Sequence, residues 1–258
     1  MLYRAGSPGR NPHVVAAQLR HHDLMDAETP TTDLSLPQAF LLLATDDKDG
    51  KPAVPVFALR TTLAGAILAE LEILGAIELR GKRVRATGAT PPTDFQHELE
   101  LIRGKSRPHT PKRWVSMLES KGEVQRVYDR MVSQGIVEQV GEKHLGLFKS
   151  TRYPEKDHGP EAALLKKLEA ALSGAPASPD AKTSETKTPE ARTPDPKTPE
   201  ARTTALIALL QAAGLLGKLF PAADRVRADE LAKDYWPARA VEDELRLIRL
   251  AQEEAPAL

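Results

Sequence analysis

The sequence has no cysteine, few aromatic residues, no net charge and no long hydrophobic run. The absence of cysteine excludes disulfides and thiolate metal sites and fits a reducing compartment. Because aromatic residues make up only 4% of the chain, a core must consist mainly of Leu, Ala, Val and Ile. The longest apolar run, 205–217, has 13 residues, whereas about 20 are needed to cross a bilayer. Residues 1–33 also lack the apolar core of a secretion signal, so we expect a cytoplasmic protein.

The charges cancel over the whole chain but are segregated along it. Between residues 80 and 130 there are 12 Lys and Arg against six Asp and Glu, a difference of +6. Residues 224–254 hold six bases and nine acids, a difference of −3. A local excess of cations attracts an anionic partner even when the net charge is zero. The segment 80–130 is therefore where we expect an anionic partner to bind.

Hydrophobic periodicity predicts a mainly α-helical fold. Leu63, Ile67 and Leu71 recur at spacings of four, which is typical of one face of a helix. Alanine and isoleucine occupy the other sides of this helix, so we expect it at the centre of a bundle. Two small β-hairpins are predicted around it, one with strands at 77–79 and 83–86 and one at 136–148 with its turn at 140–143. The predicted fold class is a single helical-bundle domain with small β-hairpins.

Composition divides the chain into an N-terminal extension and one interrupted domain. Residues 1–33 are predicted to be a flexible extension, and the domain is predicted to span 34–254. A low-complexity insertion interrupts the domain at 174–203, where KTPEART occurs at 187–193 and again at 197–203. This insertion has no aromatic residue and no aliphatic residue larger than alanine, so we expect it to be disordered.

No pattern in the sequence indicates catalysis or metal binding. There is no nucleophile elbow, phosphate-binding glycine loop or Rossmann fingerprint, and none of the seven histidines forms an i, i+4 pair. The segment 46–50 resembles the front of a calcium loop. Its sixth and twelfth positions are Lys51 and Phe57, where a calcium loop requires Gly and Glu, so we interpret it as a tight turn. We expect a protein that is not an enzyme and that has no metal and no cofactor.

Five sequence blocks in a fixed order carry a resemblance to a known family. The chain resembles the Golgi phosphoprotein 3 family domain over roughly residues 34 to 240, and its alanine- and arginine-rich composition suggests a bacterial member. The blocks are LPQAFLLLATDDKDG (36–50), LRTTLAGAILAELEILGAIEL (59–79), RVYDRMVSQGIVE (126–138), HLGLFKSTRYP (144–154) and RTTALIALLQAAGLLGKLFP (202–221).

The resemblance implies a peripheral membrane protein with an all-helical bundle core. Eukaryotic members of the family bind phosphatidylinositol 4-phosphate and retain glycosyltransferases at Golgi membranes. Their headgroup-binding tryptophan falls near Pro55 here, and their arginines fall near Ala64, Lys121 and Val124. The resemblance therefore implies anionic phospholipid or phosphoinositide membranes as the partner, together with protein clients. The candidate headgroup-binding residues are Arg60, Lys121, Arg126 and Arg130, and the candidate membrane-facing hairpin residues are Arg80, Lys82, Arg83 and Arg85.

Two alternative functions are compatible with the same cations. The predicted helices 112–120 and 123–134, followed by the hairpin 136–148, have the order of a winged helix, and Lys and Arg contact DNA phosphates as readily as lipid phosphates. However, helix 123–134 presents no obvious polar face for base recognition, so a nucleic acid is the less favoured partner. The second alternative is a protein-interaction scaffold that uses the insertion as its contact site.

Overall fold

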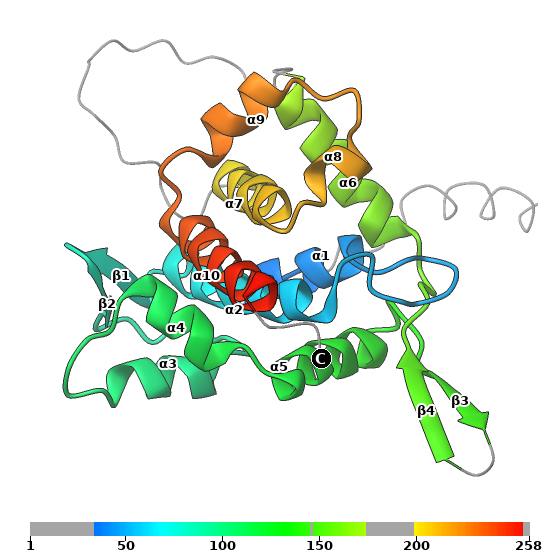
Figure 1. The fold of residues 1–258 in the computed structure, drawn as a ribbon, viewed down its shortest axis with the longest axis horizontal. Helices are drawn as coiled ribbons and strands as arrows, with labels where there is room; N and C mark the ends of the chain where they lie inside the picture. The colour runs from blue at the N-terminus through cyan, green and yellow to red at the C-terminus, as the bar shows by residue number, and fades with distance from the viewer. Residues whose placement is uncertain (1–33, 145–146, 174–198, 255–258) are drawn as a thin grey trace, which may run out of the picture. The chain divides into compact units, whose positions relative to one another are not determined.

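Helix α2 (Val56–Ile73) lies at the centre of the computed structural model, as its sequence predicts (Figure 1). Fourteen of its 18 residues are buried, and it contacts α1, α4, α5, α7 and α10. A helix that is apolar on all sides is stable only when other elements surround it. The apolar composition of α2 therefore requires neighbouring helices that cover it.

The structure describes residues 34–144, 147–173 and 199–254, and all of them belong to one compact unit. This unit is mainly α-helical with two small antiparallel sheets, which confirms the predicted fold class. Its helices are α1 (Leu36–Leu43), α2, α3 (Gln96–Arg103), α4 (Pro111–Leu118), α5 (Lys121–Ser133), α6 (Gly159–Leu172), α7 (Pro199–Ala212), α8 (Leu216–Leu219), α9 (Arg225–Ala232) and α10 (Trp236–Glu253). Its strands are β1 (Ile77–Arg80), β2 (Arg83–Ala86), β3 (Val140–His144) and β4 (Leu147–Arg152).

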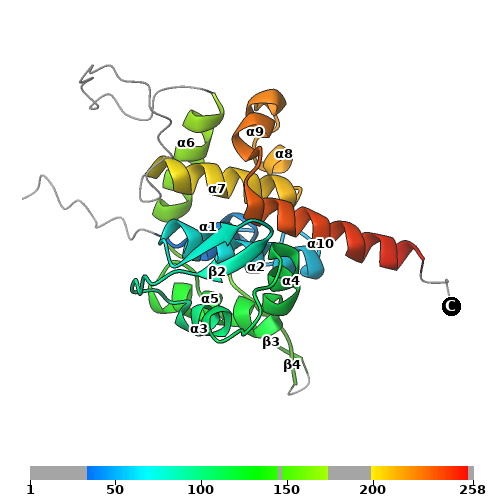
Figure 2. The same cartoon turned by 90° about the vertical axis from the view of Figure 1, so that its left-hand side faces the viewer.

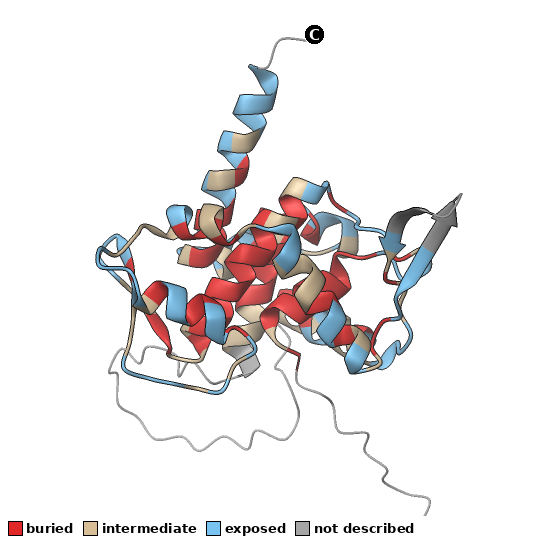
Figure 3. Cartoon of the chain, turned by 90° about the horizontal axis from the view of Figure 1, so that it is seen from below, coloured by how far each residue is buried: buried red, intermediate tan, exposed pale blue. Residues whose placement is uncertain are grey.

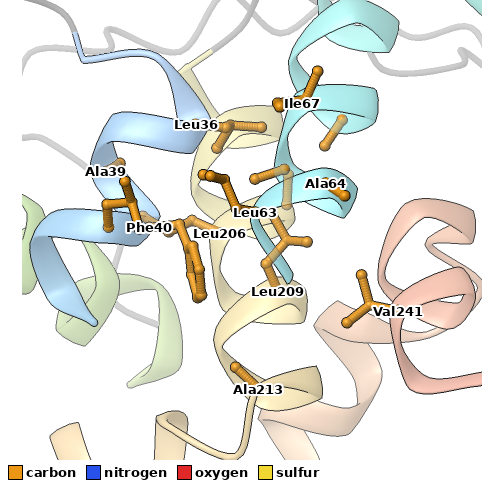
Figure 4. Close-up of a cluster of buried hydrophobic side chains, with 14 of the residues drawn as sticks. Leu36, Ala39, Phe40, Leu63, Ala64, Ile67, Leu206, Leu209, Ala213 and Val241 are labelled. Carbon is orange, nitrogen blue, oxygen red and sulfur yellow. The ribbon is translucent and has the colours of Figure 1, made fainter. Parts of the chain in front are cut away.

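The core forms where α1, α7 and α10 pack on α2. Phe40 of α1, Leu63 of α2 and Leu206 of α7 lie in one cluster of buried side chains (Figure 4). Burial of each such side chain stabilises the fold by about 1.5–3 kcal/mol. The cluster is almost entirely aliphatic, as the low aromatic content requires.

Helices α2 and α10 approach closely because Gly65 has no side chain. An added Cβ at Gly65 would lie 2.2 Å from Cγ2 of Val241 on α10. The C-terminal end of α10 extends away from the other helices (Figure 2), and its last turns are largely exposed (Figure 3). Leu247 and Leu250 are exposed apolar residues of this part. The buried residues of α10 extend as far as Leu245, so the helix packs on the core up to that point.

The two hairpins differ in how well the sequence locates them. Strands β1 and β2 lie where they were predicted, joined by the turn residues Gly81 and Lys82. The second prediction is wrong in register, because the segment expected to turn, 140–143, lies in strand β3. The apolar pair Ile136 and Val137 is buried in the core and lies outside β3, and Val137 forms an isolated antiparallel bridge with Glu155, beyond the end of β4.

The predicted insertion ends earlier than its composition suggests. Helix α7 begins at Pro199, so 199–203 are helical rather than disordered. Proline is tolerated in the first turn of a helix, and Arg202 donates hydrogen bonds to both carboxylate oxygens of buried Glu70 on α2. The second KTPEART copy is therefore divided, because its last five residues belong to the folded domain. The predicted extension 1–33 and the remainder of the insertion, 174–198, lie outside the described residues.

None of the helices within the described ranges is both long enough and apolar enough to traverse a bilayer.

Candidate functional site

The β1–β2 hairpin presents its charged residues on one face. In the observed register Leu79 pairs with Val84, and these side chains lie toward the core. Residues directly opposite each other in an antiparallel pair share a face, so Arg80 and Arg83 lie on the outer side. Glu78 and Arg85 form the next outward pair, and Lys82 is exposed in the turn. All four cations predicted for this hairpin are thus exposed.

The loop 104–110 lies against this hairpin and adds further cations to it. The amide of Val84 donates to the carbonyl of His109 at 2.9 Å, and Nη1 of Arg83 donates to the carbonyl of Pro108 at 3.2 Å. Lys105 and Arg107 are exposed on the same loop. The loop therefore extends the positive charge beyond β2.

Helix α4 starts directly after the loop and continues the positive charge. Thr110 caps α4, and Lys112 and Arg113 are exposed in its first turn. Cations are unfavourable at a helix N-terminus, which carries a partial positive charge of its own. We define the basic surface by its eight cations, of which only Arg80 has an acidic partner among the described residues, Glu78 at 2.6 Å. They are Arg80, Lys82, Arg83, Arg85, Lys105, Arg107, Lys112 and Arg113.

The six acids of segment 80–130 all interact with groups outside the basic surface. Four of them pair with arginines of α3 and α5, and two accept hydrogen bonds from neutral side chains. The contacts are Asp94 with Arg130, Glu98 and Glu123 with Arg126, Glu100 with Arg103, Glu119 with Thr61 and Asp129 with Gln125. The excess of cations seen in the sequence is therefore concentrated on the basic surface.

Arg126, a candidate headgroup residue, is already neutralised by two acids. Its Nη2 lies 2.7 Å from Oε1 of Glu98, whose side chain is fully buried, and it also contacts Glu123. Burial, together with the neighbouring Glu98 carboxylate, raises the pKa of Glu123, although Arg126 acts in the opposite direction. An anionic headgroup at Arg126 would meet two acids for one cation. The geometry therefore indicates a structural role for this arginine.

Arg130 lies beside Arg126 at a small cavity of about 280 Å³. Its Nε is 3.4 Å from Oδ2 of Asp94, and both side chains are about half exposed. Such an exposed pair contributes little to stability, roughly 0–1 kcal/mol, and can open. The cavity lining is Ser35, Gln38, Asp94, Phe95, Arg126, Val127 and Arg130.

Lys121 and Arg60 lie apart from this cavity. Lys121 begins α5, and five residues at about 100° each place Arg126 about 140° around the helix from it. Arg60 is half-buried in the second turn of α2, where its neighbour Thr61 donates to Glu119 at 2.7 Å. The structure therefore brings together two of the four candidate headgroup residues, Arg126 and Arg130.

Sequence reasoning missed that loop 104–110 joins the hairpin. The loop was recognised as a basic run, but its hydrogen bonds to β2 connect positions about 25 residues apart. The only signal in the sequence was the excess of cations over acids between residues 80 and 130.

Comparison with known proteins supplies the identity of the fold. A model of the family described as Golgi phosphoprotein 3 (GPP34) matches residues 36–248, whereas no curated protein matches the chain. The match includes α1 and most of α10 and thus nearly all of the described unit. The chain belongs to the Golgi phosphoprotein 3 family.

Proposed function

We propose that this chain is a peripheral membrane protein that binds anionic lipid headgroups through its basic surface, without a catalytic step. The observation that carries the proposal is the placement of the acids. All six acids of segment 80–130 interact with groups outside the basic surface, whose eight cations are exposed, and among the described residues only Glu78 forms an ion pair with one of them.

The energy available from this surface is large enough for reversible binding. Each Lys or Arg near an anionic membrane contributes about 1 kcal/mol, and the attraction decays within a Debye length. The hairpin is short and its outer face is charged. Binding should therefore be electrostatic and sensitive to salt.

Family resemblance favours phosphatidylinositol 4-phosphate as the specific lipid, and Arg130 is the residue with which to test it. Arg130 is half exposed, and its loss removes only a surface pair. Arg126 is a poor probe, because its substitution would leave the fully buried Glu98 carboxylate without its cation. Loss of selectivity for the 4-phosphate in Arg130→Gln would assign headgroup recognition to the cavity beside α5.

The test is flotation with neutral vesicles, vesicles containing phosphatidylserine, and vesicles containing phosphatidylinositol 4-phosphate at matched charge. The test variant combines Lys82→Gln, Arg85→Gln and Arg107→Gln, which removes three exposed cations of the basic surface. We expect its affinity for anionic vesicles to fall about 100-fold, since three cations contribute roughly 3 kcal/mol. The matched control combines Arg225→Gln, Lys233→Gln and Arg249→Gln, exposed positions on or next to α9 and α10.

The outcomes separate the proposed function from its alternatives. Equal losses in the two triple variants, or binding that salt does not weaken, would contradict a membrane role for the basic surface. Preference for duplex DNA over every vesicle would assign the nucleic-acid alternative instead. Capture of a protein client without vesicles would favour the scaffold alternative.

A further inference from the structure

A second charged site lies on the segment 46–50, which is docked onto the chain just before α6. The amide of Tyr153 donates to the carbonyl of Gly50, and the amide of Glu155 donates to the carbonyl of Asp47, both at 3.0 Å. Gly50 has φ +64°, and an added Cβ would lie 2.3 Å from the nitrogen of Pro154. Close backbone contacts therefore hold Asp47 at a defined position.

Three carboxylates meet at this junction. Asp47, Glu155 and Glu161 each place an oxygen within 4.8 Å of the others. Glu161 is only 8% exposed and the Glu155 side chain only 3%. Each of these two glutamates has one buried oxygen without a hydrogen-bond partner among the described residues, Oε1 of Glu155 and Oε2 of Glu161. Asp47 is exposed, so the cluster opens toward solvent on that side.

The cluster brings three acidic groups close together. Nδ1 of His158 contacts Oε2 of Glu155. Adjacent carboxylates repel each other unless a proton or a cation lies between them.

The spacing of the oxygens fits a hard cation. Ca²⁺ binds six to eight oxygen ligands at about 2.3–2.6 Å in a flexible geometry, so carboxylate oxygens that all lie within 4.8 Å of one another can share one ion. Mg²⁺ binds at about 2.0–2.1 Å and requires near-ideal octahedral geometry, which carboxylates from separate segments of the chain supply less readily. Carboxylate oxygens are the ligands that both ions prefer.

We propose that Asp47, Glu155 and Glu161 form a binding site for a hard divalent cation, with Ca²⁺ as the best-fitting ion. The linear calcium-loop pattern at 46–50 lacks the required Gly and Glu, which in sequence are Lys51 and Phe57. In the fold the missing acidic ligands come from residues more than 100 positions later in the chain. The turn itself is present, since Oδ1 of Asp46 accepts from the amides of Lys48 and Asp49.

The test is calorimetric titration of the full chain, freed of metal by a chelator, with CaCl₂ and in parallel with MgCl₂. We expect saturable binding of one Ca²⁺, weaker binding of Mg²⁺ and a higher thermal midpoint with Ca²⁺. Glu161→Gln and Asp47→Asn should each weaken Ca²⁺ binding at least tenfold. Glu169→Gln, an exposed position two turns further along α6, should leave it unchanged.

Two results would overturn the proposal. One is the absence of saturable Ca²⁺ binding up to about 10 mM, well above the roughly 0.1–1 mM dissociation constants of weak calcium sites. The other is equal Ca²⁺ binding by the two cluster variants and Glu169→Gln. Because Asp47 is exposed, Asp47→Asn tests the site even if Glu161→Gln disturbs folding, which circular dichroism would detect.

Discussion

Replacement of Arg202 by methionine tests whether the contact between α7 and Glu70 stabilises the fold. Glu70 lies on the central helix with a side chain that is 6% exposed. Its two carboxylate oxygens accept from Nη1 and Nη2 of Arg202 at 2.7 and 2.8 Å. Oε2 also accepts from the amide of Leu36, the first residue of α1, at 2.9 Å. One carboxylate therefore joins α1, α2 and α7.

The loss in Arg202→Met should be large because it leaves a buried charge without its cation. Removing one partner of a buried ion pair costs about 3–5 kcal/mol. Arg202 is 26% exposed, so water can replace part of its contribution, and we expect the lower end, about 3 kcal/mol. In a domain of this size that loss corresponds to a midpoint lower by roughly 6–12 °C. Adding Glu70→Gln should restore at least half of the lost stability, because no buried charge is then left.

Urea unfolding measures both effects, with Arg239→Met as the control. Arg239 pairs with Asp234 at 3.0 Å, but both side chains are more than 60% exposed, so its loss should cost at most about 0.5 kcal/mol. A change below about 1 kcal/mol in Arg202→Met would refute the reasoning. The same conclusion would follow if the double variant were as unstable as Arg202→Met alone, since the pair would then not be coupled.

Two further predictions concern helix α2. Gly65→Ala should lower the free energy of unfolding by about 1–2 kcal/mol, because overpacking against Val241 outweighs the roughly 1 kcal/mol gain in helix propensity. In urea unfolding, the double variant Gly65→Ala with Val241→Ala should lose less stability than the sum of the two single losses. Additive losses would contradict the contact. Burial raises the pKa of Glu72 above its ordinary 4.5, despite the hydrogen bond from Nε1 of Trp236. The folded chain therefore keeps this proton when the unfolded chain has lost it, so stability should fall as pH rises from about 4.5 through the raised pKa. The stability of Glu72→Gln should not depend on pH in this way. If the unfolding midpoints of the parent chain and Glu72→Gln differed by the same amount at every pH in that range, the prediction would be wrong.

The sequence was a good guide wherever its pattern was periodic and local. The apolar spacing of 63–74 predicted the central helix, and the alternation in 77–86 predicted the first hairpin. It misplaced the second hairpin because it paired Ile136 and Val137 with 146–148, whereas Val137 forms its bridge with Glu155. No local pattern indicates which later segment pairs with these two residues.

Composition also misplaced the boundary of the insertion. The two KTPEART copies have identical local propensities, yet Arg202 of the second copy pairs with Glu70. Nothing within the repeat indicates that partner, which lies 132 positions earlier in the chain. The carboxylate cluster was missed for the same reason, since Asp47 and Glu161 are 114 positions apart, from 161 − 47.

The sequence identified segment 80–130 as the location of the candidate site. It could not indicate which cations of this segment are paired with acids and which are not. The decisive quantity is local charge rather than net charge. Four of the six acids in segment 80–130 form ion pairs with Arg103, Arg126 and Arg130. The positive potential around Arg126 and Arg130 is therefore much reduced. The hairpin cations keep theirs because, in the part of the chain that the structure describes, Glu78 is the one acid that pairs with them. Exposed charges further apart than about 8 Å are largely screened at physiological salt, so the acids that make the whole chain neutral need not weaken this surface. The two triple variants change net charge by the same amount, and any difference in their vesicle binding therefore measures position alone.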